Sequence, residues 1–185
     1  MSSFSSKKKK YKKKSLWAKN ILTRRIEILF HNIGGNIREI LLKKLEDKLY
    51  NKCSKEGFIQ DKSINILSYS SGIVEANKVM FDVMFECNIC HPVEGQLIKC
   101  RVQNITRAGI KATYAKEQNS PILVFIARDH HYNNEYFNKI KENDNITVSV
   151  IGIRFELNDE CISVLSELRP AKIMKTKTKV TVLEN

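Results

Sequence analysis

The sequence lacks a long hydrophobic run, and this absence limits the classes of protein to which it can belong. A membrane-spanning helix needs roughly 20 consecutive apolar residues, and no stretch of the 185 residues approaches that length. The N-terminal region carries lysines but lacks the apolar segment of a secretory signal. We therefore expect an intracellular protein with no membrane partner. The 42% of hydrophobic residues is enough for a folded core.

Cysteine is present without a complete zinc-binding pattern. The odd number of five cysteines, in a chain without an export signal, indicates reduced thiols. Cys87 and Cys90 form a single pair at zinc-ligand spacing, whereas zinc takes four ligands, typically from two such pairs. Cys53, Cys100 or Cys161 could complete a site, but residues three apart in a strand point to opposite faces. The sequence therefore predicts buried thiols, no metal and no cofactor.

No motif in the sequence indicates catalysis. Asp129, His130 and His131 could form a triad only with Cys100 or Ser120 as the nucleophile, and no nucleophile motif surrounds either residue. The chain also lacks a glycine-rich loop of the kind that cradles phosphates. We predict a protein that is not an enzyme.

The basic charge lies in the two ends of the chain. Of the net charge of +12, residues 1–20 carry eight lysines and no acid, and residues 169–185 contribute a further +4, which leaves the body neutral. A lysine-rich tail attracts phosphates in a salt-dependent way. The run at 7–14 could equally be a nuclear-import or solubility tract. The β-branched residues near the C-terminal end favour an extended form that could add a strand to a partner's sheet: Thr176, Thr178, Val180, Thr181 and Val182.

The first half of the body predicts a small α+β domain over residues 21–91, after a flexible lysine-rich tail at 1–20. Residues 25–30 alternate as a strand does, a turn follows at 32–36, and strands are predicted over 63–69 and 79–87. Between them, apolar residues at three- and four-residue steps mark a helix that Asn36 can cap: Ile37, Ile40, Leu41, Leu45 and Leu49.

The second half predicts a five-stranded OB-fold barrel over residues 92–168, followed by a basic tail at 169–185. An apolar strand at 122–126 leads into the polar corner Arg128-Asp129-His130-His131, and a helical insert follows before the last two strands. The five predicted strands are 96–102, 110–114, 122–126, 146–155 and 161–165.

The order of these landmarks resembles one family, the seventh subunit of eukaryotic RNA polymerase II and its archaeal counterpart. The resemblance covers about residues 21–168, with Lys-, Asn- and Ile-rich usage like that of versions encoded by large nucleocytoplasmic DNA viruses. Its landmarks are the strand-turn-helix at 26–49, Cys53-Ser54-Lys55-Glu56-Gly57-Phe58-Ile59, Gly72, Pro92-Val93-Glu94-Gly95, Ser120-Pro121-Ile122-Leu123-Val124-Phe125-Ile126, and Ile151-Gly152-Ile153-Arg154 before Asn158-Asp159.

The resemblance implies a non-catalytic stalk subunit of a multisubunit DNA-dependent RNA polymerase. Its N-terminal domain would dock on core subunits, its S1-type barrel would lie near emerging RNA, and a counterpart of the polymerase's fourth subunit is a candidate partner. The expected location is the nucleus, a cytoplasmic virus factory or the virion. The alternative is a free-standing S1-type protein that binds single-stranded RNA in translation or RNA turnover.

The resemblance and the residue types together nominate two sets of site residues. The polymerase-core contacts are Asn32, Ile33, Gly34, Gly35, Lys52, Cys53 and Gly57, although Gly34-Gly35 also suits an ordinary turn. The candidates for RNA binding are Lys111, Phe125, Arg128, His130, His131 and Arg154. For Phe125, packing in the core is a stronger interpretation than RNA binding. For His130 and His131, an ordinary exposed turn is as good an interpretation as RNA binding. We expect weak, salt-sensitive RNA binding, because Ile110 and Lys111 stand where tight S1 binders carry an aromatic residue.

Overall fold

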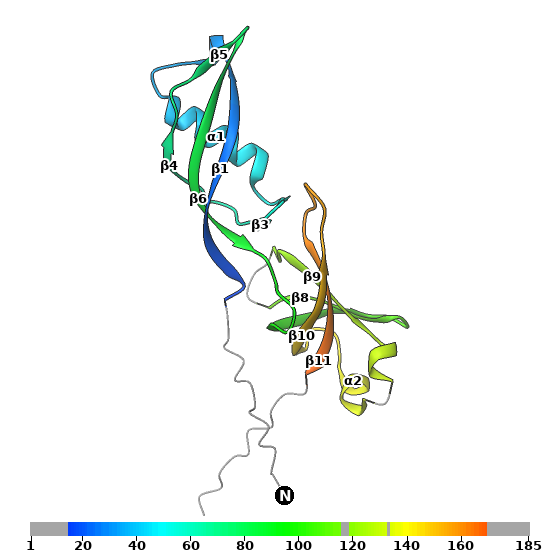
Figure 1. Cartoon of the computed structure of the whole chain (residues 1–185). Coiled ribbons are helices and arrows are strands. Elements are labelled where there is room, and N and C mark those ends of the chain that lie inside the picture. Colours follow the sequence, from blue (N-terminus) through cyan, green and yellow to red (C-terminus); the bar gives the residue numbers. More distant parts are fainter. Residues whose placement is uncertain (1–14, 116–118, 133, 170–185) are drawn as a thin grey trace, which may run out of the picture.

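The computed structural model describes residues 15–115, 119–132 and 134–169, which form two sheets placed end to end (Figure 1). In chain order the elements are β1 (Trp17–Leu29), η1 (Phe30–Asn32), α1 (Ile37–Leu49), β2 (Cys53–Ser54), β3 (Gly57–Ile59), β4 (Asn65–Tyr69), β5 (Ile73–Glu75), β6 (Lys78–Cys90), β7 (Leu97–Ile105), β8 (Gly109–Tyr114), β9 (Ile122–Ala127), η2 (Asp129–His131), α2 (Glu135–Lys139), β10 (Asn145–Arg154) and β11 (Ile162–Arg169). No helix among the described residues is both long and apolar enough to cross a bilayer.

The N-terminal sheet is organised around β6. Strand β1 pairs with β6 antiparallel over its whole length, and β5, β4 and β3 pair with β6 along its other edge. The strand predicted over 79–87 is present within β6, and its alternate residues Val79, Phe81, Val83 and Phe85 are all buried. Helix α1 packs its buried leucines into the same core cluster. The alternation of β6 and the spacing of α1 therefore build one shared core.

Several local features of this sheet differ from the prediction. Strand β1 begins at Trp17, inside the segment 1–20 that the sequence suggested was a tail, because its first residues pair with the end of β6. Asn36 makes no side-chain cap; its backbone carbonyl accepts the amide of Ile40 instead. The stretch after α1, for which no strand was predicted, forms the hairpin β2–β3, in which Cys53 lies opposite Phe58.

The second sheet is a closed five-stranded barrel in the order β10-β11-β9-β8-β7, with β7 also paired to β10. All five predicted barrel strands are present, and the closure is consistent with an OB-fold. The predicted helical insert between the third and fourth strands is α2, and the polar corner before it forms the 3-10 helix η2. Strand β9 pairs parallel with β11, which brings two segments distant in sequence side by side.

The hairpin β2–β3 fastens the two sheets together. Its hydrogen bonds place it in the N-terminal sheet, yet Cys53 and Phe58 pack into the core cluster of the barrel. The amide of Cys53 donates to the carbonyl of Asp159 at 2.8 Å, and the carbonyl of Cys53 accepts the amide of Asn158 at 2.8 Å. These two bonds tie the hairpin to the loop between β10 and β11, which reaches toward it in Figure 1.

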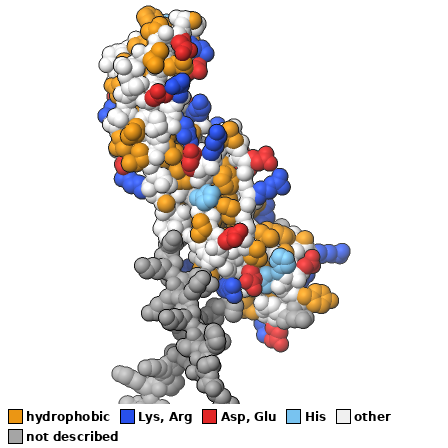
Figure 2. Space-filling model, viewed as in Figure 1, with side chains coloured by type: hydrophobic (Ala, Val, Ile, Leu, Met, Phe, Trp, Pro, Cys, Tyr) orange, Lys and Arg blue, Asp and Glu red, His pale blue; other side chains and the backbone are white. Residues whose placement is uncertain are grey.

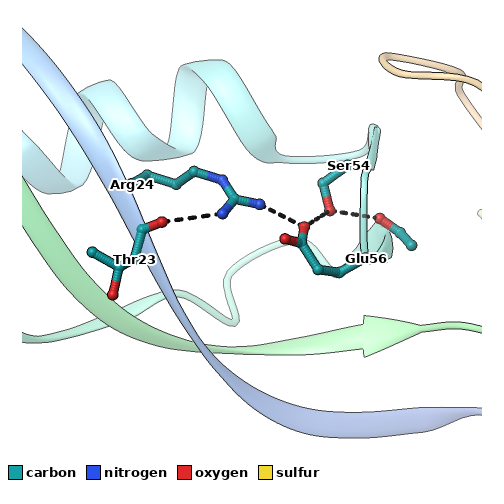
Figure 3. Close-up of polar contacts among 5 residues, drawn as sticks. Thr23, Arg24, Ser54 and Glu56 are labelled. Carbon is teal, nitrogen blue, oxygen red and sulfur yellow. Dashed lines mark hydrogen bonds and ion pairs between the residues drawn. The ribbon is translucent and has the colours of Figure 1, made fainter.

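An ion pair holds this hairpin against β1. In Figure 3, Arg24 of β1 donates to the Glu56 carboxylate at 2.5 Å, and the Ser54 hydroxyl donates to the same carboxylate oxygen at 3.0 Å. Burial alone would raise the pKa of Glu56, but these two hydrogen bonds outweigh it and leave the pKa lowered. The carboxylate is therefore held ionised between the two elements.

Candidate nucleic-acid interface

A groove of about 480 Å³ runs along the outer wall of the barrel across β8, β9, β11 and β10. It brings together Lys111, Phe125 and Arg154, three of the six residues predicted to bind RNA. The strand register explains this convergence: Phe125 lies opposite Lys111 of β8 on one side and opposite Leu165 of β11 on the other. The remaining lining residues are Leu123, Gly152, Ile153, Ser163, Val164 and Leu165.

Phe125 faces outward, contrary to the preferred sequence interpretation of core packing. The run 122–126 is apolar throughout, but β9 buries only its alternate residues Ile122, Val124 and Ile126 inside the barrel. Phe125 is consequently 38% exposed. A Cβ on the neighbouring Gly109 would collide with the carbonyl of Ile126 and lie 3.0 Å from the Phe125 ring, so glycine there leaves room for the ring.

The groove combines an apolar floor with cations at its rim. Lys111 and Arg154 are both exposed, and among the described residues the ion pair of Arg154 is with Glu156 at 3.4 Å on the surface. Exposed pairs of this kind contribute little, so the guanidinium can readily exchange its partner. Single-stranded nucleic acid needs cations for its phosphates and a π-face for base stacking. Lys111, Arg154 and Phe125 supply both kinds of group within one groove.

Two further residues predicted to bind RNA have structural roles instead. Arg128 donates to the carbonyls of Arg107 at 2.9 Å and Thr106 at 3.2 Å, and its guanidinium lies 5.2 Å above the Phe137 ring. These contacts hold the β7–β8 turn against α2. The Arg128 guanidinium is thus used within the chain.

His131 is also engaged inside the chain. It is 6% exposed and stacks on Phe137 with ring centroids 5.3 Å apart. Its Nε2 accepts the amide of Leu168 at 2.9 Å, so its Nδ1 donates to the carbonyl of Ala127 at 2.8 Å. Both ring nitrogens are occupied, which leaves neither for a nucleotide. The neighbouring His130 is exposed at the polar corner and does not line the groove.

The residues considered for a catalytic triad do not come together. Ser120 precedes β9 and Asp129 follows it, so about 20 Å of strand separates them. The Ser120 hydroxyl donates to the carbonyl of Ile122 at 2.6 Å and accepts the amide of Tyr114 at 2.9 Å. Cys100 is fully buried, and burial raises its pKa to about 12. A thiol with that pKa is not a nucleophile at neutral pH.

The two groups of predicted polymerase-core contacts lie at opposite ends of α1 and not in one region. Asn32, Ile33, Gly34 and Gly35 precede the helix, whereas Lys52, Cys53 and Gly57 follow it, and a 13-residue helix is about 20 Å long. The first group lies at the far end of the N-terminal sheet (Figure 1). Among the described residues, apart from the two chain neighbours, no heavy atom lies within 4 Å of a Cβ built on Gly34 or Gly35. In the second group, Cys53 and Gly57 are buried at the junction with the barrel.

The far end of the N-terminal sheet exposes large apolar side chains that the sequence prediction did not include. Phe30 is 63% exposed, Ile73 57% and Val74 61%. Phe30 follows β1, and its amide donates to the carbonyl of Asn77 at 2.9 Å, beside the turn that joins β5 to β6. We call Phe30, Ile33, Gly34, Ile73 and Val74 the distal tip. The short Ile-Val-Glu run of β5 could have been identified as a strand, but the sequence does not show that this strand is exposed.

The cysteines are divided between the two cores. Cys87 packs with the N-terminal sheet and Cys90 with the barrel, as expected for positions three apart in a strand. Burial raises the pKa of Cys53 to about 12 and that of Cys87 to about 11, with Asp159 adding to the effect at Cys53. Among the described residues, no three His, Cys, Asp or Glu side chains are grouped so that they could hold a metal ion.

The sequence is similar to a viral protein whose name describes a polymerase subunit. It is 28% identical over 170 residues to a protein of Acanthamoeba polyphaga mimivirus described as a "putative DNA-directed RNA polymerase subunit". The similarity covers 83% of this chain and 82% of the mimivirus protein. Neither sheet alone contains that share of the chain, so the similarity extends over both. No protein-family model matches the sequence. The similarity supports a role as a polymerase subunit without identifying which one.

Proposed function

We propose that this protein is a non-catalytic stalk subunit of a multisubunit DNA-directed RNA polymerase, of the kind encoded by large DNA viruses. The observation that carries the proposal is the similarity to the mimivirus protein across most of both chains. The closed five-stranded barrel with a cation-rimmed groove supports it, because barrels of this type bind single-stranded nucleic acid. The corresponding locations are the nucleus, the virus factory or the virion.

In this proposal the distal tip docks on the polymerase core. Exposed apolar side chains grouped at one end of a molecule mark an interaction site more often than scattered ones do. Phe30 and Val74 are the candidate anchors, and Gly34, with open space around it, permits close approach of a partner backbone. Buried aromatic anchors typically contribute a large part of the binding energy of an interface. A counterpart of the polymerase's fourth subunit would be a further partner.

The barrel groove in turn contacts emerging RNA. Phe125 would stack on a base while Lys111 and Arg154 neutralise phosphates. The binding should be weak, because the groove contains one aromatic ring and two cations. A docked stalk protein does not need high intrinsic affinity, since attachment to the core raises the local concentration of transcript.

Affinity purification from the native context tests the proposal. The tagged wild-type protein should recover the largest polymerase subunits in fixed proportion, and Phe30→Asp should lose most of that recovery. Tyr132→Asp is the matched control, because Tyr132 is 84% exposed on the barrel and lies outside both the tip and the groove. Recovery of RNA or ribosomal proteins without polymerase would replace this proposal with the free-standing RNA-binding protein.

A further inference from the structure

A second cavity lies where the two sheets meet. It has a volume of about 380 Å³ and is enclosed by β1, the C-terminal half of α1, the β2–β3 hairpin and the β10–β11 loop. Its lining residues are Arg24, Ile26, Leu45, Lys48, Leu49, Lys52, Cys53, Ser54, Lys55, Leu157 and Asn158. We call it the junction cleft. Four of these residues are cations and none is an acid.

The cations of the junction cleft are only partly neutralised by the chain itself. Arg24 is paired with Glu56, which lies beside the cleft. Lys48 lies within electrostatic reach of Glu27, but that carboxylate forms its ion pair with Lys78 at 2.8 Å. Lys48, Lys52 and Lys55 are all exposed. Figure 2 shows Lys and Arg side chains gathered near the junction of the two sheets. The result is a concave surface with excess positive charge.

The apolar part of the cleft offers little surface to a protein side chain. Ile26, Leu45 and Leu49 are only 3%, 0% and 9% exposed, so an apolar anchor would bury almost no new area against them. Leu157 is the exception at 64%. The lining of the cleft also contains no aromatic ring on which a base could stack. Its chemistry therefore favours phosphate groups held by lysines acting as point charges.

The β10–β11 hairpin contributes residues to both the barrel groove and the junction cleft. Arg154 at the end of β10 lines the groove, and Leu157 and Asn158 in the following loop line the cleft. The two bonds between this loop and Cys53 fix the cleft lysines relative to the groove.

We propose that the junction cleft is a second, phosphate-binding segment of the RNA site, so that one single strand runs from Phe125 in the groove to Lys48, Lys52 and Lys55. The inference rests on the proposed RNA contact of the barrel and extends it onto the N-terminal sheet. The groove supplies base stacking and the cleft supplies only charge. The cleft should therefore add affinity only for RNA long enough to reach it, and this added affinity should depend on salt and not on base identity.

Binding of oligouridylate to the full-length protein at several salt concentrations tests this inference. The RNAs are about 5 and about 15 nucleotides long, spanning the range of OB-fold site sizes. The triple variant Lys48→Gln/Lys52→Gln/Lys55→Gln should bind the long RNA about tenfold more weakly. It should also lower the slope of log affinity against log salt by about 2, at roughly 0.7 per phosphate contact. Binding of the short RNA should not change.

The matched control is Lys43→Gln/Lys44→Gln/Lys99→Gln, which removes the same charge from exposed lysines outside both cavities. Both variants retain the N-terminal lysines, so any contribution from these is equal. If the two triple variants weaken RNA binding equally, the proposed RNA-binding role of the cleft is wrong, whereas that of the groove still stands. The proposal is also wrong if the cleft variant binds RNA as the wild type does but no longer recovers the polymerase subunits. That result would indicate that the cleft binds an acidic protein segment. If the wild-type protein binds neither RNA, the proposed RNA contact itself fails.

Discussion

The barrel and the N-terminal sheet present their surfaces to partners in different ways. In the barrel every strand pairs on both edges, so its outer wall can be recognised only through side chains. Among the described residues, β1 pairs with β6 alone, and the end of the N-terminal sheet away from the barrel exposes Phe30, Ile73 and Val74. A side-chain groove across several strands suits a flexible polymer, whereas an apolar tip suits a pocket on a folded protein.

The hairpin β2–β3 prevents the two sheets from being independent. It is hydrogen-bonded to one sheet, packed into the core of the other and held to β1 by the Arg24–Glu56 pair. Residues at the junction should therefore contribute to the stability of the whole chain, while residues at the tip and in the groove should contribute to binding. The following predictions test this division, from the largest expected effect to the smallest.

Phe58→Ala should give the largest loss of stability. Phe58 is 6% exposed, packs into the barrel core cluster and lies 6.2 Å from Trp17 between ring centroids. Removing a buried phenyl ring costs about 3–5 kcal/mol. Phe30→Ala at the exposed tip should change the free energy of unfolding by less than about 0.5 kcal/mol. Urea denaturation measures both, and similar values for the two variants would contradict the division.

Gly57→Ala should destabilise the junction in a different way. Gly57 has φ of 132°, and a Cβ there would collide with the carbonyl of Cys90. Strain of this kind costs about 1–3 kcal/mol, and the collision adds to it. Gly34→Ala, with nothing within 4 Å and φ outside the left-handed region, should be neutral or slightly stabilising. Thermal unfolding measures both variants. If the midpoint of Gly57→Ala matches that of the wild type, the close contact between Gly57 and the carbonyl of Cys90 does not limit this position.

Phe125→Ala should weaken RNA binding while the protein remains folded. The ring is 38% exposed in the groove, and stacking on an aromatic ring is worth about 1–3 kcal/mol per base. Tyr132→Ala, which removes a more exposed ring outside the groove, is the control. Fluorescence anisotropy with labelled oligouridylate measures both affinities. Equal affinities for the two variants would mean that the groove does not stack bases.

Glu56→Gln should have the smallest effect, and that effect should depend on pH. The pKa of Glu56 is below its ordinary value of 4.5 in the folded chain. The stabilisation is therefore complete above that ordinary value and is lost as the pH falls through the lower, folded value. We expect a loss of about 0.5–1 kcal/mol at pH 7, in line with partly exposed ion pairs. This loss should shrink as the pH falls below 4.5 and disappear once the pH is below the lowered pKa of the folded chain.

The control for this pH dependence is Glu135→Gln, whose partner Lys139 lies at 3.6 Å on an exposed helix surface. That variant should not differ measurably from wild type at any pH. Unfolding free energies measured across the acid range compare the two variants. A loss for Glu56→Gln that persists unchanged at low pH would show that the charge of Glu56 is not what holds the hairpin.

The barrel was the more predictable of the two regions. Its five strands follow from apolar–polar alternation and turn residues, both local signals. The hairpin β2–β3 was missed because its strands are two and three residues long, too short to show a period. Phe125 was misjudged because a uniformly apolar run does not reveal which of its residues face inward.

The sequence by itself determined the α1 face, the inward face of β6 and the number of barrel strands, because each depends on a repeat between near neighbours. Only the tertiary structure decided which of the nominated residues meet. Barrel closure and the parallel pairing of β9 with β11 place Phe125 among Lys111, Leu165 and Arg154. The same closure commits Arg128 and His131 to internal contacts. Pairings between distant segments depend on the whole chain, and no local pattern encodes them.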